Sequence, residues 1–96
     1  MNYSVGIVEV IGCTNAIYIL DVMLKASAAN LISWETIFGI GRVSVFIKGD
    51  VENVKAAVEA AKSDGTCEIF ASYVIANPLE ETRRMLEKSA MRHGLL

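Results

Sequence analysis

The chain has 96 residues and a mass of 10.4 kDa, which fits one domain because domains usually run from about 50 to 250 residues. Hydrophobic residues make up 53% of it and charged residues 21%, which excludes intrinsic disorder, since disorder requires low hydrophobicity and high net charge. The net charge of −2 excludes a general nucleic-acid binder, which would carry a strongly basic surface.

Mean hydropathy is high for so short a chain, at +0.42. The longest apolar run is only Ala16–Leu20, whereas a transmembrane helix needs about 20 such residues, so we expect no membrane span. A domain of this size buries only about 60–65% of its unfolded surface. The surplus of apolar residues therefore predicts that neighbouring subunits cover part of the surface.

The amino-terminal segment and the two cysteines are both typical of a cytoplasmic protein. Residues 1–4 carry neither the basic segment nor the apolar core of a secretory signal, so we expect a cytoplasmic protein. Cys13 and Cys67 lie far apart in the sequence and form no C-x-x-C pair. We expect two reduced thiols.

The first third of the chain predicts a strand followed by a helix. A run of β-branched residues predicts the strand over residues 3–11, and Gly12 ends it. Thr14 or Asn15 is expected to cap a helix that continues to about Ala29. This helix is apolar most of the way round, so we expect one side to pack on its own sheet and the other to meet a second subunit.

Two further strands are predicted over Leu31–Ile37 and Val43–Lys48. The segment Phe38–Gly41 between them contains two glycines, which is typical of a hairpin turn. A small anion-binding nest of backbone N–H groups is the alternative interpretation. The segment is not a dinucleotide fingerprint, because it lacks the third glycine and joins two strands.

The second half of the chain repeats the plan of the first. Asp50 is expected to cap a helix that ends near Lys62, with Gly65 in the left-handed conformation after it. Residues 68–76 predict a fourth strand. A charged and solvated last helix over about residues 78–92 follows, with the proline in its first turn.

The predicted order is β-α-β-β-α-β-α. It indicates one α+β domain over residues 1–96, with a core over about 3–77, of the ferredoxin-like split β-α-β type. We expect a four-stranded antiparallel sheet with helices on one face, plus a C-terminal helix.

Few residues could carry catalysis. His93 is the single histidine, and we expect it in a solvated, fraying tail. Glu80 and Glu81 form the one carboxylate pair, on a solvated helix beside arginines. We therefore predict no catalytic residue, no metal site and no cofactor. Arg42 is the one arginine placed to handle a phosphate, and we expect it to be a surface charge at a strand edge.

Lys25 is unusual because it follows Met23 and Leu24 on the apolar helix. It is either a solvated lysine whose stem lies along apolar surface or a lysine at a subunit edge.

Four segments, taken together, resemble a known family. They are Val5-Gly6-Ile7-Val8-Glu9, Asp21-Val22-Met23-Leu24-Lys25-Ala26, Lys48-Gly49-Asp50-Val51 with Val54-Lys55-Ala56-Ala57 after it, and Val74-Ile75. Their order and spacing resemble the single-domain hexameric shell proteins of bacterial microcompartments, the BMC domain family, over about residues 4–79.

The resemblance implies a structural, non-enzymatic function. Six copies would form a flat disc, and discs would tile into a shell around enzymes in the bacterial cytoplasm. The implied partners are a homo-hexamer, other shell proteins, the encapsulated enzymes and small metabolites that cross a central pore. By resemblance, that pore is lined by Phe38, Gly39, Ile40 and Gly41, and the hexamer edge carries Lys25 and Asn77.

Three segments depart from the family pattern, and one of them is the long charged C-terminal helix, which replaces a short tail and is expected either to pack back on the disc or to bind cargo. The usual pore loop K-I-G-x-G is replaced by an apolar loop with one extra residue, Thr36–Gly41, so we expect a narrower and drier pore, or a closed one. The usual P-R-P-H is replaced by Ala76–Leu79, with Asn77 near the place of the edge arginine.

Two other functions remain open from the residues alone. One is a ferredoxin-like regulatory module that binds a small effector at subunit interfaces. The other is a small phosphatase, which would depend on Arg42. Assembly or stability that depends on a metabolite would favour the regulatory module.

Overall fold

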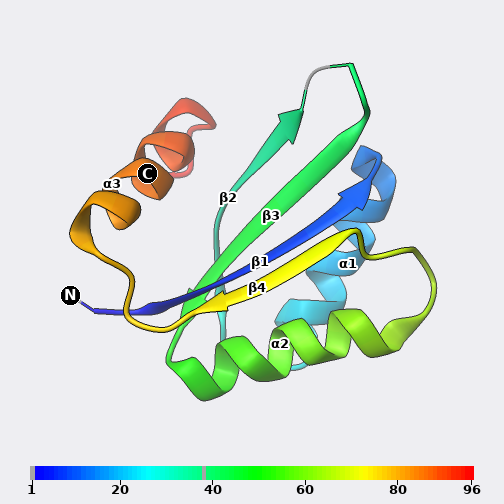
Figure 1. The fold of residues 1–96 in the computed structure, drawn as a ribbon, viewed down its shortest axis with the longest axis horizontal. Coiled ribbons are helices and arrows are strands. Elements are labelled where there is room, and N and C mark those ends of the chain that lie inside the picture. Colours follow the sequence, from blue (N-terminus) through cyan, green and yellow to red (C-terminus); the bar gives the residue numbers. More distant parts are fainter. Residues whose placement is uncertain (1, 38) are drawn as a thin grey trace.

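The computed structural model of the chain describes residues 2–37 and 39–96. Within these residues the chain forms a single sheet flanked by helices (Figure 1). The elements are β1 Ser4–Ile11, α1 Cys13–Lys25, β2 Asn30–Ile37, β3 Arg42–Gly49, α2 Val51–Asp64, β4 Ala71–Ile75 and α3 Glu80–Arg92.

The four strands lie in the order β2-β3-β1-β4, and each neighbouring pair is antiparallel. This is the ferredoxin-like split β-α-β arrangement, so the predicted fold class is confirmed. Helices α1 and α2 cover one face of the sheet, and α3 lies on the opposite side, against β2 (Figure 1).

The core has two layers because successive side chains of a strand point to opposite faces. In β1, Val8 and Val10 are fully buried in the larger layer, with Ile19 and Met23 of α1. The smaller layer lies under α3. It consists of Val5, Ile32, Leu86 and Ala90, with Tyr3, Ile7 and Phe46 packed against it.

Helix α2 begins and ends as the sequence predicts. The Asp50 carboxylate accepts a hydrogen bond from the Asn53 N–H at 2.9 Å, which satisfies one of the free N–H groups of the first turn. Gly65 follows the helix with φ 78°, a left-handed conformation that favours glycine.

The predicted cap of α1 is wrong. The residue at the N-cap position is Gly12, and neither Thr14 nor Asn15 accepts a capping hydrogen bond there. Instead, the Asn15 side-chain amide donates to the Ile11 carbonyl at 3.0 Å. Because α1 follows β1 directly, the single residue between them turns the chain with a positive φ of 86°. Glycine adopts this conformation without steric cost, so Gly12 suits the position.

The predicted end of α1 is also wrong, because the helix stops at Lys25 rather than near Ala29. Local hydrogen bonds of Ser27 explain the early stop. Its hydroxyl donates to the Met23 carbonyl at 3.2 Å and accepts from the Ala29 N–H at 3.1 Å. Such side-chain bonds compete with the helical ladder.

The last strand and last helix are shorter than predicted. Strand β4 covers Ala71–Ile75 rather than residues 68–76, because its pairing with β1 ends at Glu9, whose carbonyl accepts from the Phe70 N–H at 2.9 Å. Helix α3 begins at Glu80, so Pro78 precedes the helix instead of lying in its first turn.

Gly6 is the place where α2 approaches the sheet most closely. A Cβ atom at this position would lie 2.9 Å from Val54 and 3.0 Å from both Ile47 and Val58. The first distance is shorter than real Cβ contacts and the other two are tighter than most of them, so a side chain at this position forces α2 or β3 to shift.

We predict that Gly6→Ala destabilises the fold by about 1–3 kcal/mol, the usual cost of overpacking a core. Since about 1 kcal/mol shifts the melting temperature of a domain this size by about 4–8 °C, thermal unfolding followed by circular dichroism will detect the change. Gly49→Ala is the matched control, because its Cβ would lie 3.4 Å from Ala29, an ordinary contact. Equal melting temperatures for the two variants would contradict the packing argument.

Candidate functional site

Residues 39–41, which lead into β3, extend past one end of the sheet (Figure 1). Gly39 and Gly41 have φ values of 92° and 73°, which lie in the region that glycine enters without steric cost. The Gly12 N–H donates to the Gly41 carbonyl at 2.7 Å and so ties the turn to the start of α1. Of the predicted pore-lining residues, Phe38 lies outside the described residues.

Apolar side chains are exposed at this end of the molecule. Ile40, at the tip of the turn, is 55% exposed. Ile11, which precedes Gly12, is 46% exposed. Two isoleucine side chains are therefore exposed to solvent at the end of the molecule where Gly39 and Gly41 shape the turn.

Asn77 lies at the other end of the sheet, in the connection from β4 to α3. Its N–H donates to the Ser4 hydroxyl, with 3.4 Å between the heavy atoms, and Ser4 is paired with Gly49 where β1 begins. The side chain is exposed and the φ of 49° is positive, a conformation that asparagine tolerates better than most residues.

Lys25 ends α1 and is also far from the β2–β3 turn, because α1 runs antiparallel to β1 and starts at the turn end. Its side chain is 76% exposed, and its ammonium lies 2.6 Å from the Asp21 carboxylate. The hydrogen bond to Asp21 raises the pKa of Lys25 above its ordinary value, so the ammonium stays charged. The lysine is thus an exposed charge that is paired with Asp21 of its own helix and accessible to another molecule.

An open apolar groove of about 270 Å³ lies between α1 and the sheet. Its lining is almost entirely apolar, and Ile17 on its rim is 66% exposed. In the part of the chain that the structure describes, α1 packs against α2 and the sheet, and its fully buried side chains are Ala16, Ile19 and Met23. The groove is lined by Cys13, Ala16, Ile17, Leu20, Leu31, Trp34, Val43 and Val45.

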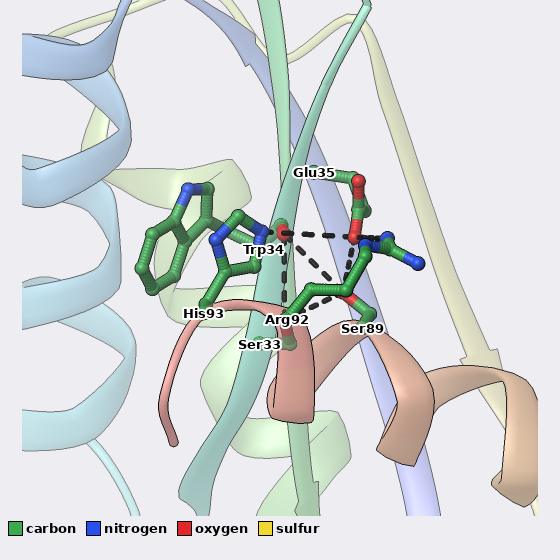
Figure 2. Close-up of polar contacts among 6 residues, drawn as sticks. All are labelled: Ser33, Trp34, Glu35, Ser89, Arg92 and His93. Atoms are coloured by element: carbon green, nitrogen blue, oxygen red, sulfur yellow. Dashed lines mark hydrogen bonds and ion pairs between the residues drawn. The ribbon is translucent and has the colours of Figure 1, made fainter. Parts of the chain in front are cut away.

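A second cluster joins α3 to the edge strand β2 (Figure 2). We call it the latch cluster; it consists of Ser33, Trp34 and Glu35 of β2, Ser89 and Arg92 of α3, and His93, which follows α3. The hydroxyls of Ser33 and Ser89 are 2.6 Å apart and both residues are buried. The Glu35 carboxylate accepts hydrogen bonds from Ser89 and Arg92.

The latch cluster holds Glu35 in its ionised form. The hydrogen bond from Ser89, helped by the positive charge of Arg92, lowers the pKa of Glu35 below its ordinary value despite some desolvation. His93 stacks on Trp34, with ring centroids 3.9 Å apart and an angle of 23° between the planes (Figure 2).

The prediction that His93 lies in a solvated tail is therefore wrong. The helix end does not fray, because the N–H groups of His93 and Leu95 both donate to the Ala90 carbonyl. No local sequence pattern predicts that His93 stacks on Trp34, because the two residues are far apart along the chain. The apolar positions Leu86 and Ala90 were the available signal that one face of the last helix is buried.

The surroundings of Cys67 and Arg42 do not favour covalent or phosphate chemistry at these two residues. Burial raises the pKa of the Cys67 thiol, which disfavours the reactive thiolate. Arg42 lies 3.9 Å from the Glu9 carboxylate and 4.5 Å from the centre of the Phe70 ring, as a strand-edge charge would. Residues 2–37 and 39–96 contain no group of three metal-ligating side chains and no helix long and apolar enough to cross a membrane.

Comparison with known proteins identifies the family. The model of the BMC domain matches residues 4–78. The chain belongs to the BMC domain family. The match ends before α3, so the latch cluster combines a strand inside the matched region with a helix beyond it.

The relatives of this BMC domain are shell proteins. The chain is 36% identical over 90 residues to the carboxysome shell protein CcmK2 of Synechococcus elongatus, covering 90% of this chain and 87% of that protein. It is 38% identical over 87 residues to the bacterial microcompartment shell protein PduA of Salmonella typhimurium, covering 88% and 92%.

A solved structure shares the fold. The crystal structure of a microcompartment protein from Desulfitobacterium hafniense superposes with a TM-score of 0.78 at 26% identity over 93% of this chain. The present chain spans about half of that chain, 49% of its length.

Proposed function

We propose that this BMC domain is a structural, non-catalytic shell protein that assembles into a cyclic hexamer and tiles a microcompartment facet in the bacterial cytoplasm. The observation that carries the proposal is the position of its two surfaces at opposite ends of one sheet. The glycine turn with Ile40 lies at one end, and Lys25 and Asn77 lie at the other. Each subunit of a six-fold disc needs one end that faces the central axis and an opposite end that faces the neighbouring discs.

The uncovered side of α1 supports assembly. A single chain leaves Ile17 exposed above an apolar groove, and exposed apolar surface of this kind is typical of protein interfaces. The groove suits an effector poorly, because small-molecule sites place several polar groups among their apolar lining. The regulatory-module alternative is therefore not favoured.

The proposed pore is apolar. Six copies of the β2–β3 turn would bring Ile40 and the two flanking glycines around one axis, with Phe38 beside them by resemblance. Hydrophobic constrictions oppose the passage of water and ions. We propose a pore that is narrower and drier than is usual for the family, through which small metabolites pass to and from encapsulated enzymes.

The proposed outer edge relies on Lys25, with Asn77 in place of an arginine. An exposed ammonium suits carbonyl or carboxylate groups of a neighbouring disc, including discs of other shell proteins. Asparagine offers hydrogen bonds but no charge, so Lys25 supplies the positive charge of this edge.

We predict that Lys25→Ala leaves hexamers intact but weakens the formation of sheets from them. One exposed contact contributes at most about 1 kcal/mol, but each disc repeats it at six edges. Electron microscopy across a concentration series will measure the threshold for sheets, which should rise several-fold. Lys62→Ala is the matched control, since Lys62 is also exposed and pairs with Glu59 on its own helix. Equal thresholds for both variants would mean that another contact governs tiling.

We predict that Ile40→Ser raises the conductance of assembled hexamers to a charged metabolite several-fold, because a hydroxyl wets the constriction. Single-channel recording in a planar bilayer measures it. Met85→Ser is the control, as Met85 is 71% exposed on α3, away from the turn. Unchanged conductance in Ile40→Ser would remove Ile40 from the constriction.

A further inference from the structure

Trp34 connects the apolar groove to the end of α3. Its ring lines the groove between α1 and the sheet. The same ring stacks on His93, which follows α3, although α3 lies on the opposite face of the sheet (Figure 2). Because β2 is an edge strand, the end of α3 reaches past this edge to the groove wall. The wall therefore depends on a helix that lies outside the residues matched by the family model.

Helix α1 presents a second apolar stripe to the groove. Cys13, Ile17 and Leu20 all line the groove, and their spacing of four and then three residues places them on one side of the helix. Another side of α1 faces α2, since the Tyr18 hydroxyl donates to the Asp64 carboxylate at 3.0 Å. The stripe is thus turned away from α2, and Ile17 on it is exposed.

The opposite flank of the sheet carries the other edge strand, β4. The chain from Ile69 to Asn77 contains no charged residue and no proline, whereas solitary sheet edges are usually protected by one or the other. An uncharged edge of this kind is suited to being covered. Beside it, where the chain leads from α2 into β4, lies a hollow of about 480 Å³. The hollow is lined by Lys62, Cys67, Ile69, Phe70, Ala71 and Ser72.

The two flanks match in position along the sheet. Helix α1 starts at the end of the sheet where the β2–β3 turn lies, so Ile17 in its second turn is near that end. Strand β4 also starts there, because Ala71 pairs with Glu9 near the end of β1. An exposed apolar side chain on one flank and a hollow on the other therefore lie at the same end of the molecule.

We propose that the β4 flank of one copy docks on the α1 groove of the next, with Ile17 entering the hollow, and that His93 shapes this contact by fixing Trp34. The contact rests on the proposed hexamer. A ring closes only through heterologous contacts, in which one flank of each copy meets the opposite flank of its neighbour. With the β2–β3 turn at the axis, those flanks are the groove flank and the β4 flank.

Two other occupants of the groove fit less well. The groove measures about 270 Å³, which is below the range of about 300–1,000 Å³ for small-molecule sites, and it offers few polar groups. Two grooves packed against each other about a two-fold axis would make a dimer that cannot grow into a ring, and both β4 edges would stay uncovered.

The two cysteines of the chain can report the contact, since Cys13 lines the groove and Cys67 lines the hollow. Cys13→Ser and Cys67→Ser each leave a single thiol. Native mass spectrometry first establishes that the unmodified chain and both variants form hexamers. The variants are then mixed, dissociated in denaturant, reassembled and treated with a short bismaleimide, which links two thiols.

Crosslinked pairs should form in the mixture and in neither variant alone, because the contact brings unlike flanks together. Pairs in Cys67→Ser alone would indicate groove-to-groove contact and overturn the proposal. Mixed hexamers that give no pairs would also overturn it while leaving the hexamer in place. Failure of the unmodified chain to form hexamers would instead contradict the proposed function, and this contact with it.

His93→Ala tests the part played by α3. Loss of the stack on Trp34 should raise the protein concentration at which hexamers dissociate about two- to tenfold, the range that one aromatic pair supplies. Arg92→Ala is the matched control, because Arg92 also fastens α3 to Glu35 but takes no part in the stack. No change in His93→Ala, or an equal change in both variants, would remove His93 from the contact.

Trp34 is the single tryptophan, so its fluorescence reports cover over the groove without any substitution. When hexamers are diluted until they dissociate, the emission maximum should move to longer wavelength as the ring becomes exposed to water. An emission maximum that stays constant while native mass spectrometry shows dissociation would overturn docking at the groove.

Discussion

Strand β1 is the element on which the rest of the structure depends. It lies between β3 and β4, so its antiparallel pairing sets the register of the central sheet. Its alternating side chains supply both core layers, with Val8 under the large helical layer and Val5 under α3. Its two ends also position the proposed surfaces: the Ser4 hydroxyl accepts a hydrogen bond from the Asn77 N–H, and Gly12, which follows Ile11, donates one to Gly41 of the β2–β3 turn.

The second constraint is an excess of apolar surface. Gly6 lets α2 come close to the sheet and close the larger core layer, yet α1 still has an uncovered side. An exposed Ile17 beside an apolar groove is costly for an isolated chain in water. Assembly into a disc would remove this cost, and it would also bring the exposed isoleucine of each turn toward a shared axis.

Much of the fold could be predicted from the sequence, because the signals were local. Alternating β-branched residues indicated the strands, and Asp50 and Gly65 correctly indicated the start and end of α2. The cap and end of α1 were wrong, since Gly12 and the hydrogen bonds of Ser27 overrode the usual preferences. Those bonds depend on where strand and helix meet, which residue preferences do not encode.

The proposed surfaces also differ in how far the sequence could predict them. The family resemblance suggested the turn, Lys25 and Asn77, and the structure adds only that they occupy opposite ends of the sheet. The latch cluster could not be predicted, because Trp34 and His93 meet only when α3 folds across an edge strand. A histidine near a chain end carries no sequence signal of such a contact.

Native mass spectrometry of the purified chain without added ligand tests the central claim most directly. We predict a species of about six times 10.4 kDa, because neighbouring copies would cover the exposed side of α1 and surround the turn. A monomer, dimer or trimer as the sole species under these conditions would contradict it.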